Sequence, residues 1–115
     1  MAKKTNPFIG RWRIVSMSAW DEDYINAEVQ AFIEFNAKNS GEFQFGYVQG
    51  EMNYRLTARD GEPAIEWTWE GNDENDSAQG RGWAVVKGEE LHGMIFCHEG
   101  DDSEFVAKEA TEKKS

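Results

Sequence analysis

The chain is predicted to fold as an all-β domain, an eight-stranded antiparallel up-and-down barrel. Three observations predict it: short segments rich in β-branched and aromatic residues recur along the chain, many alternate apolar with polar residues, and turn-forming clusters separate them. Such alternation is typical of antiparallel sheets with one buried face. We prefer a closed barrel because a meander of this number of strands leaves two exposed edges unless it closes. A two-sheet sandwich is the alternative, since alternation does not separate a curved wall from two stacked ones.

The expected strands follow one another with no connection long enough for a crossover helix. They span residues 8–18, 28–36, 41–49, 51–59, 62–70, 78–87, 90–98 and 103–108. Tight turns are expected at 39–41, 50–51, 60–61 and 87–88, where residues that accept positive φ gather. One short helical turn is expected within 18–27, with Ser18 as its cap and with Trp20 and Tyr24 on one face.

Large aromatic side chains are expected to fill the barrel. Alternation across residues 41–70 places one set of side chains inward, and Trp83 is expected to join them. The set is Phe43, Phe45, Tyr47, Met52, Tyr54, Leu56, Ile65, Trp67 and Trp69. With strands this short and side chains this large, a solid core is preferred to a roomy pocket.

The length of 115 residues predicts one domain, with a barrel over about 7–108 and a flexible tail over 109–115. The formal net charge is -10, and the segment from Thr5 to Ala107 contains 7 basic and 20 acidic side chains. Nucleic acids and anionic membranes bind clusters of basic side chains through their phosphate groups, so we expect neither as a partner. Any charged partner of the folded body is expected to be cationic.

The number of cysteines and the first residues of the chain predict the cellular compartment. Cys97 is the chain's single cysteine, so no disulfide framework, paired-thiol redox motif or thiolate zinc site is expected. The start carries no apolar run that would make a signal peptide or a membrane span. We expect a cytoplasmic protein without a cofactor.

Gly10-Arg11-Trp12, at the start of the first strand, resembles the Gly-x-Trp signature of the lipocalins and the wider calycin group. The resemblance implies an eight-stranded up-and-down barrel, closed at the end where Trp12 lies and open at the other, often around a small apolar ligand. Residues 69–74, 80–83 and 98–105 also resemble stretches of uncharacterised small bacterial proteins, a likeness that implies no activity.

Candidate binding residues gather where alternate connections of such a barrel meet. The connections near 21–24, 72–76 and 98–102 are expected at one end, rich in carboxylates and edged by aromatic rings. The predicted ligand-binding residues are Trp20, Asp23, Tyr24, Trp69, Asp73, Glu74, Asp76, His98, Asp101 and Asp102. Clustered carboxylates raise some of their own pKa values and attract cations, which predicts a small cationic or amphipathic ligand. The alternative is that these acidic loops are merely solvated and keep the protein soluble.

Metal binding and catalysis at this end are weaker interpretations. The carboxylates of 73–76 and 101–102 are oxygen donors that suit calcium or magnesium, but their spacing matches no calcium loop, so no metal is predicted. His98 beside Asp101 or Asp102 is a possible general base, although turn capping by these aspartates is preferred and no catalytic residue is predicted.

The strands at 78–87 and 90–98 are apolar on both faces. An outward apolar face needs a cover, which the N-terminal segment or a second copy of the chain would supply. A protein-interaction module, or a homodimer through these two strands, is therefore the alternative function.

Overall fold

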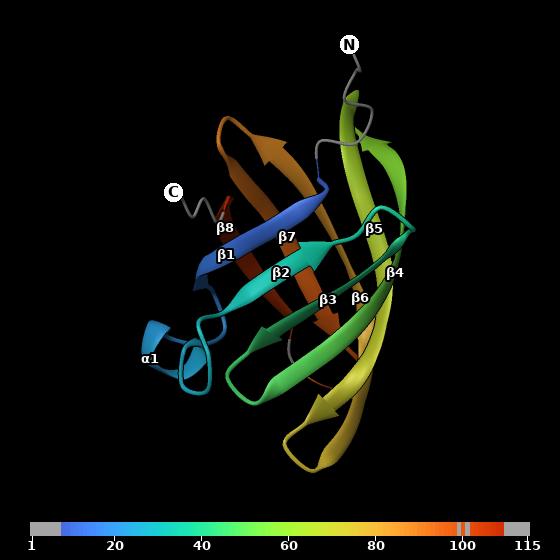
Figure 1. The fold of residues 1–115 in the computed structure, drawn as a ribbon. Coiled ribbons are helices and arrows are strands. Elements are labelled where there is room, and N and C mark those ends of the chain that lie inside the picture. Colours follow the sequence, from blue (N-terminus) through green and yellow to red (C-terminus); the bar gives the residue numbers. More distant parts are fainter. Residues whose placement is uncertain (1–7, 99, 101, 110–115) are drawn as a thin grey trace.

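The computed structural model describes residues 8–98, 100 and 102–109, and it is a closed eight-stranded barrel (Figure 1). Each strand pairs antiparallel with its neighbour in sequence, and β8 pairs back to β1. The predicted up-and-down barrel is confirmed, and the sandwich is wrong. The strands are β1 Gly10–Met17, β2 Phe32–Phe35, β3 Ser40–Phe45, β4 Val48–Arg59, β5 Glu62–Asp73, β6 Asp76–Lys87, β7 Glu90–Cys97 and β8 Asp102–Glu109.

The strand boundaries differ from the prediction at β2 and at the β5–β6 hairpin. The strand expected over 28–36 is limited to Phe32–Phe35, because the side chain of Asn26 accepts a hydrogen bond from the Ala31 amide at 2.8 Å and shapes a turn there. The ladder of β5 and β6 continues to the pair Asp73 and Asp76, so the expected loop over 72–76 is a tight hairpin. The expected tail lies outside the described residues except for Glu109, which pairs with Trp12.

The turn between β3 and β4 is at Gly46 and Tyr47, and the expected turn at 50–51 is wrong. Gly46 has a φ of 58°, which glycine adopts without steric cost. Gly50 lies within β4 and has a different role. A Cβ at Gly50 would lie 2.6 Å from the Phe43 ring, so this glycine permits close packing inside the barrel.

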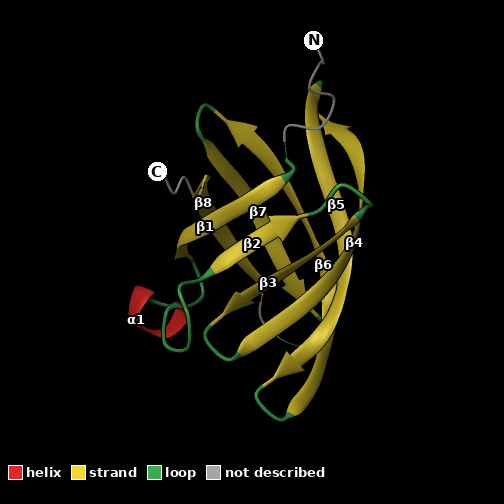
Figure 2. Cartoon of the chain, viewed as in Figure 1, coloured by secondary structure: helices red, strands yellow, loops and turns green. Residues whose placement is uncertain are grey.

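The short helix α1 (Glu22–Ile25) lies between β1 and β2, within the expected segment. Its cap is Asp21, whose carboxylate accepts a hydrogen bond from the Tyr24 amide at 2.9 Å. Ser18 has another role: its hydroxyl accepts a hydrogen bond from the Glu104 amide at 2.9 Å and ties the end of β1 to β8. The described chain has this one helix (Figure 2), and no helix in that part is long and apolar enough to cross a membrane.

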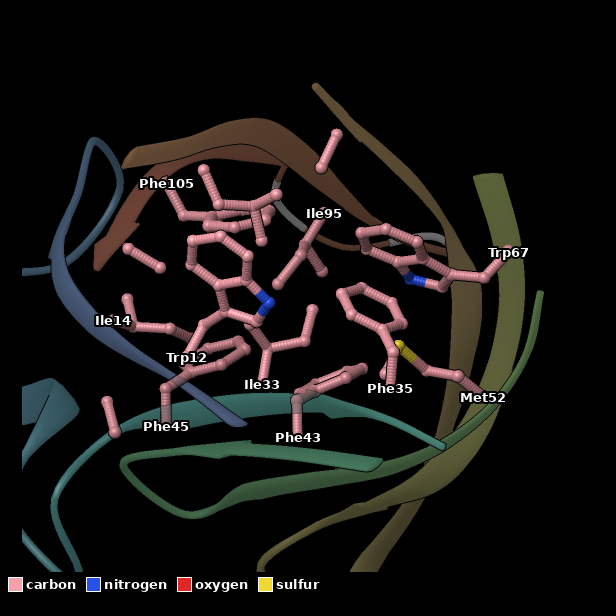
Figure 3. Packing of buried hydrophobic residues seen from close by; sticks show 14 of the residues in the cluster. Trp12, Ile14, Ile33, Phe35, Phe43, Phe45, Met52, Trp67, Ile95 and Phe105 are labelled. Atoms are coloured by element: carbon pink, nitrogen blue, oxygen red, sulfur yellow. The ribbon is translucent and has the colours of Figure 1, made fainter. Parts of the chain in front are cut away.

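The barrel interior is filled by side chains from the surrounding strands (Figure 3). Fully buried rings include Phe35, Phe43 and Phe105, and the Trp12 indole donates a hydrogen bond to the Phe8 carbonyl at 3.0 Å. This agrees with the expected solid core. Leu56, also expected inside, is 47% exposed, because β4 continues past its last pair with β3, which joins Asn53 to Ser40.

Two further side chains expected inside the barrel lie elsewhere. Tyr47 is in the β3–β4 turn and is exposed. Trp83 faces outward, half-buried, because its neighbours Gly82 and Ala84 occupy the inward positions of β6. The Trp67 indole lies over Gly82, so the interior has no room for a second indole at this level.

Gly82→Ala tests this packing. A Cβ at Gly82 would lie 2.4 Å from the Trp67 ring, and Trp67 is 3% exposed, so we expect the substitution to lower the free energy of unfolding by about 1–3 kcal/mol. Trp67→Phe should relieve the clash, because the smaller ring leaves space. It loses no hydrogen bond within the described structure, where the Trp67 indole nitrogen has no partner. Urea unfolding of both single variants and the double variant measures the coupling, and additive effects would contradict the account.

Candidate functional site

Three connections meet at one end of the barrel, the lower end in Figure 1. These are the β1–β2 connection with α1, the β3–β4 turn and the β5–β6 turn. Backbone hydrogen bonds join them in series: the Gly46 amide donates to the Ile25 carbonyl at 2.8 Å, and the Glu74 amide donates to the Tyr47 carbonyl at 2.9 Å. The connections expected together at 21–24 and 72–76 therefore lie at the same end, and the β3–β4 turn links them through these hydrogen bonds.

Aromatic rings from two of these connections pack together at this end. The rings of Trp20 and Tyr24 are stacked with centroids 6.1 Å apart, and Tyr24 meets Tyr47 edge-on at 6.0 Å. Trp20 also packs on buried Phe45 at 5.0 Å, which anchors the group to the core. A Cβ at Gly46 would lie 2.4 Å from the Tyr24 ring, so the glycine lets this ring lie against the turn.

Carboxylates lie close enough to act on Tyr24. Burial raises the pKa of the Tyr24 phenol above its ordinary value of 10.0, and the negative charges of Asp73 and Glu74 raise it further, while a backbone hydrogen bond with Tyr47 opposes them. The carboxylates of Asp73 and Glu74 therefore act electrostatically on a ring of this aromatic group. We call Trp20, Tyr24, Tyr47, Asp73 and Glu74 the rim cluster.

The other predicted site residues are placed differently. Asp23 is exposed in the first turn of α1, and Asp76 is exposed opposite Asp73. Trp69 is buried behind the rim, where its indole donates to the Phe96 carbonyl at 3.2 Å. Asp102 is exposed at the start of β8, and Asp101 lies outside the described residues.

His98 lies on the outer wall of the barrel. It is exposed at the end of β7, its amide donates to the Gln79 carbonyl at 2.7 Å, and it lines an open groove of about 750 Å³ together with Glu51 and Glu70. Solvent therefore reaches His98, which the acid–base hypothesis requires.

A row of four glutamates on this wall was not found from the sequence. Cross-strand pairing places Glu34 opposite Glu42, Glu42 opposite Glu51, and Glu51 opposite Glu70. Like charges directly opposite one another destabilise a sheet. Only the strand register reveals this row, because the four residues are far apart in the sequence. Within the described residues, no group of three or more His, Cys, Asp or Glu side chains is arranged to hold a metal ion.

No protein-family model, curated protein or solved structure matches the chain. The antiparallel eight-stranded barrel is consistent with the calycin-like architecture that Gly10-Arg11-Trp12 suggested. The arrangement of side chains on this barrel is therefore the basis for a functional proposal.

Asp73→Asn should lower the pKa of the Tyr24 phenol, because it removes a negative charge that disfavours the phenolate. Part of the upward shift should remain, since burial is its largest cause. With a folded-state pKa above the unfolded value, the contribution of Tyr24 to stability is complete below pH 10.0 and is lost as the pH rises through the folded pKa. Titration of the Tyr24 ring resonances by NMR measures the change. Glu89→Gln, in the β6–β7 turn of the opposite end, is the matched control and should leave the Tyr24 pKa unchanged.

Proposed function

We propose that this protein is a binding module that holds a small cationic or amphipathic ligand at the rim cluster. The observation that carries the proposal is the packing of Trp20, Tyr24 and Tyr47 at one end of the barrel, with Asp73 and Glu74 acting on the same phenol. Aromatic faces and carboxylates each attract a cation, and this cluster combines both.

The chemistry of the cluster favours organic cations. A cation within about 6 Å of a Trp or Tyr ring centre gains about 0.5–1 kcal/mol at an exposed site and about 2 kcal/mol where water is excluded. Carboxylates beside the ring add a longer-range attraction. A substituted ammonium ion, with an apolar surface around its charge, suits this combination better than a bare metal ion.

The filled interior favours binding across the rim over binding within the barrel. The core side chains occupy the space that a lipocalin-like barrel would use for an apolar ligand. Trp20 and Tyr24 are only half-buried and so are available to a ligand from outside. We propose a cytoplasmic, lipocalin-like barrel whose ligand lies on the rim.

Benzyltrimethylammonium is a suitable probe of this function. We expect it to quench or shift tryptophan fluorescence in a saturable manner, because Trp20 would form part of its site. Trp20→Ala and Asp73→Asn should each weaken binding several-fold, in line with the loss of about 1 kcal/mol from a ring or a nearby charge. Isothermal titration calorimetry gives the affinities.

Glu89→Gln is the matched control for the charge effect, since it removes one negative charge from the opposite end. Binding by this variant should equal that of the parent protein. Equal weakening by Glu89→Gln and Asp73→Asn would show that only net charge matters, and the rim site would be rejected.

A second candidate function is supported by the outer face of β6 to β8. Trp83, Met94, Phe96 and Val106 point outward and are half-buried. Three of them, Trp83, Met94 and Val106, line a shallow groove of about 300 Å³. We propose that this face joins two copies of the chain or receives a protein partner, because contiguous apolar patches on a protein surface mark interaction sites.

Sedimentation velocity over a wide range of protein concentrations tests the homodimer. Association should appear as a rising sedimentation coefficient, and Met94→Asp should abolish it by placing a charge in the apolar face. Ser77→Asp, at an exposed position nearer the other end of β6, adds the same charge outside the face and should leave association unchanged. A single monomeric coefficient at all concentrations would exclude the homodimer.

A further inference from the structure

Three arginines meet in one groove on the outer wall of β4 to β6. Arg55 and Arg59 are on β4 and Arg81 is on β6, and all three are exposed. The groove encloses about 690 Å³, within the range of small-molecule sites, and Glu66 is the one carboxylate among its described lining residues. This part of the surface is therefore locally basic on a chain whose net charge is -10.

None of these three arginines forms an ion pair with a described carboxylate. The register places Glu66 directly opposite Arg55 and Glu62 directly opposite Arg59, yet in the described structure no carboxylate oxygen lies within 4.0 Å of these guanidinium groups. The contrast is Arg11, which meets Glu34 at 2.9 Å on the same kind of exposed wall. The guanidinium groups in the groove thus keep their hydrogen-bonding capacity.

Aromatic rings hold two of these guanidinium groups. The Arg59 guanidinium carbon lies 3.8 Å from the centre of the Trp83 ring, and that of Arg81 lies 5.9 Å from the centre of the Phe96 ring. Stacking on Trp83 occupies one face of the Arg59 guanidinium and leaves its in-plane N–H groups as donors, while Arg81 lies at the outer limit of a cation–π contact. Such a fork matches the two oxygens of a carboxylate or phosphate.

We propose that this groove is an anion-binding site for a small molecule that carries phosphate or carboxylate groups. Arg59 donates from a position set by its contact with Trp83, Arg81 donates from beside Phe96, and Arg55 supplies a third positive charge. Asn53 and Thr68 line the same groove and are able to complete the hydrogen bonding of the bound oxygens. The site lies on the barrel wall and is separate from the rim cluster.

The overall negative charge of the protein slows the approach of an anion but does not prevent binding. At physiological salt the screening length is about 8 Å, so distant carboxylates act weakly on a bound anion while the adjacent arginines act strongly. The binding is therefore a local property of the groove. Glu66, directly opposite Arg55, opposes it.

Titration with inorganic pyrophosphate and, separately, with citrate at constant ionic strength tests the site. NMR of the arginine Nε–Hε groups should show saturable shifts confined to Arg55, Arg59 and Arg81. A response to pyrophosphate alone supports a phosphate ligand, and a response to citrate alone supports a carboxylate ligand. Absence of both responses overturns the proposal.

Substitutions separate a built site from general charge attraction. Arg59→Gln and Arg81→Gln should each weaken binding at least about tenfold, as expected for loss of charged hydrogen bonds. Arg13→Gln, an exposed arginine of β1 outside the groove, removes the same charge and should leave the affinity within about twofold. Glu66→Gln should tighten binding. Equal losses from Arg13→Gln and Arg81→Gln would overturn the proposal.

Discussion

The pairing of β8 with β1 is the contact on which the rest of the molecule depends. It runs from Trp12 opposite Glu109 to Met17 opposite Phe105, with an irregularity between Ile14 and Ser16. Without it, the meander would present two unpaired edges and an open hydrophobic face. With it, every strand has two neighbours, and successive connections alternate between the two ends. The side-chain hydroxyl of Ser103, buried at the start of β8, accepts a hydrogen bond from the Ala19 amide at 3.1 Å and so attaches the helix-bearing connection to this closure.

Closure at this strand number leaves an interior that side chains can fill, and here large rings fill it with the help of glycines. Gly50 and Gly82 have no Cβ where the rings of Phe43 and Trp67 come within 2.6 Å of that position. The glycines thus allow indole and phenyl groups to reach across the barrel. The consequence for function is direct, because a filled interior directs ligand binding to the rim and the outer walls.

The sequence was sufficient for strand number, order and most inward positions, because a period-two pattern carries that information. It misplaced the β3–β4 turn because Gly50 looks like a turn residue, whereas its role is close packing against Phe43 and Trp69. Apart from Tyr47 and Leu56, the inward set of these two strands survived the error: moving the turn from 50–51 to 46–47 shifts the pairing by an even number of residues, which keeps the same faces. The error did, however, assign the wrong cross-strand neighbours to residues of β3 and β4. The opposition of Glu42 to Glu51 depends on the true register.

The same dependence on register explains why the candidate sites were only partly predictable. The rim cluster was foreseen in Trp20, Tyr24, Asp73 and Glu74, since topology alone brings their connections together. Tyr47 was missed because it was assigned to a strand. The arginine groove was missed because residues on β4 and β6 become neighbours only through the β5 register, and because net charge averages over the whole chain.

An acidic groove and an arginine-containing groove adjoin on one wall of this barrel. Glu51 and Glu70 line a groove that also contains Arg81 at its margin, and Arg81 in turn lines the groove with Arg55 and Arg59. Because the glutamates lie on outward positions of β4 and β5 and the arginines on outward positions of β4 and β6, the sheet holds the two groups at a fixed spacing. Arg55 and Arg59 form no ion pair with the glutamates opposite them in the described structure, whereas Arg11 and Glu34 form one across β1 and β2. The three arginines therefore remain available to ligands, and the glutamates that lie opposite one another lower the stability of the sheet.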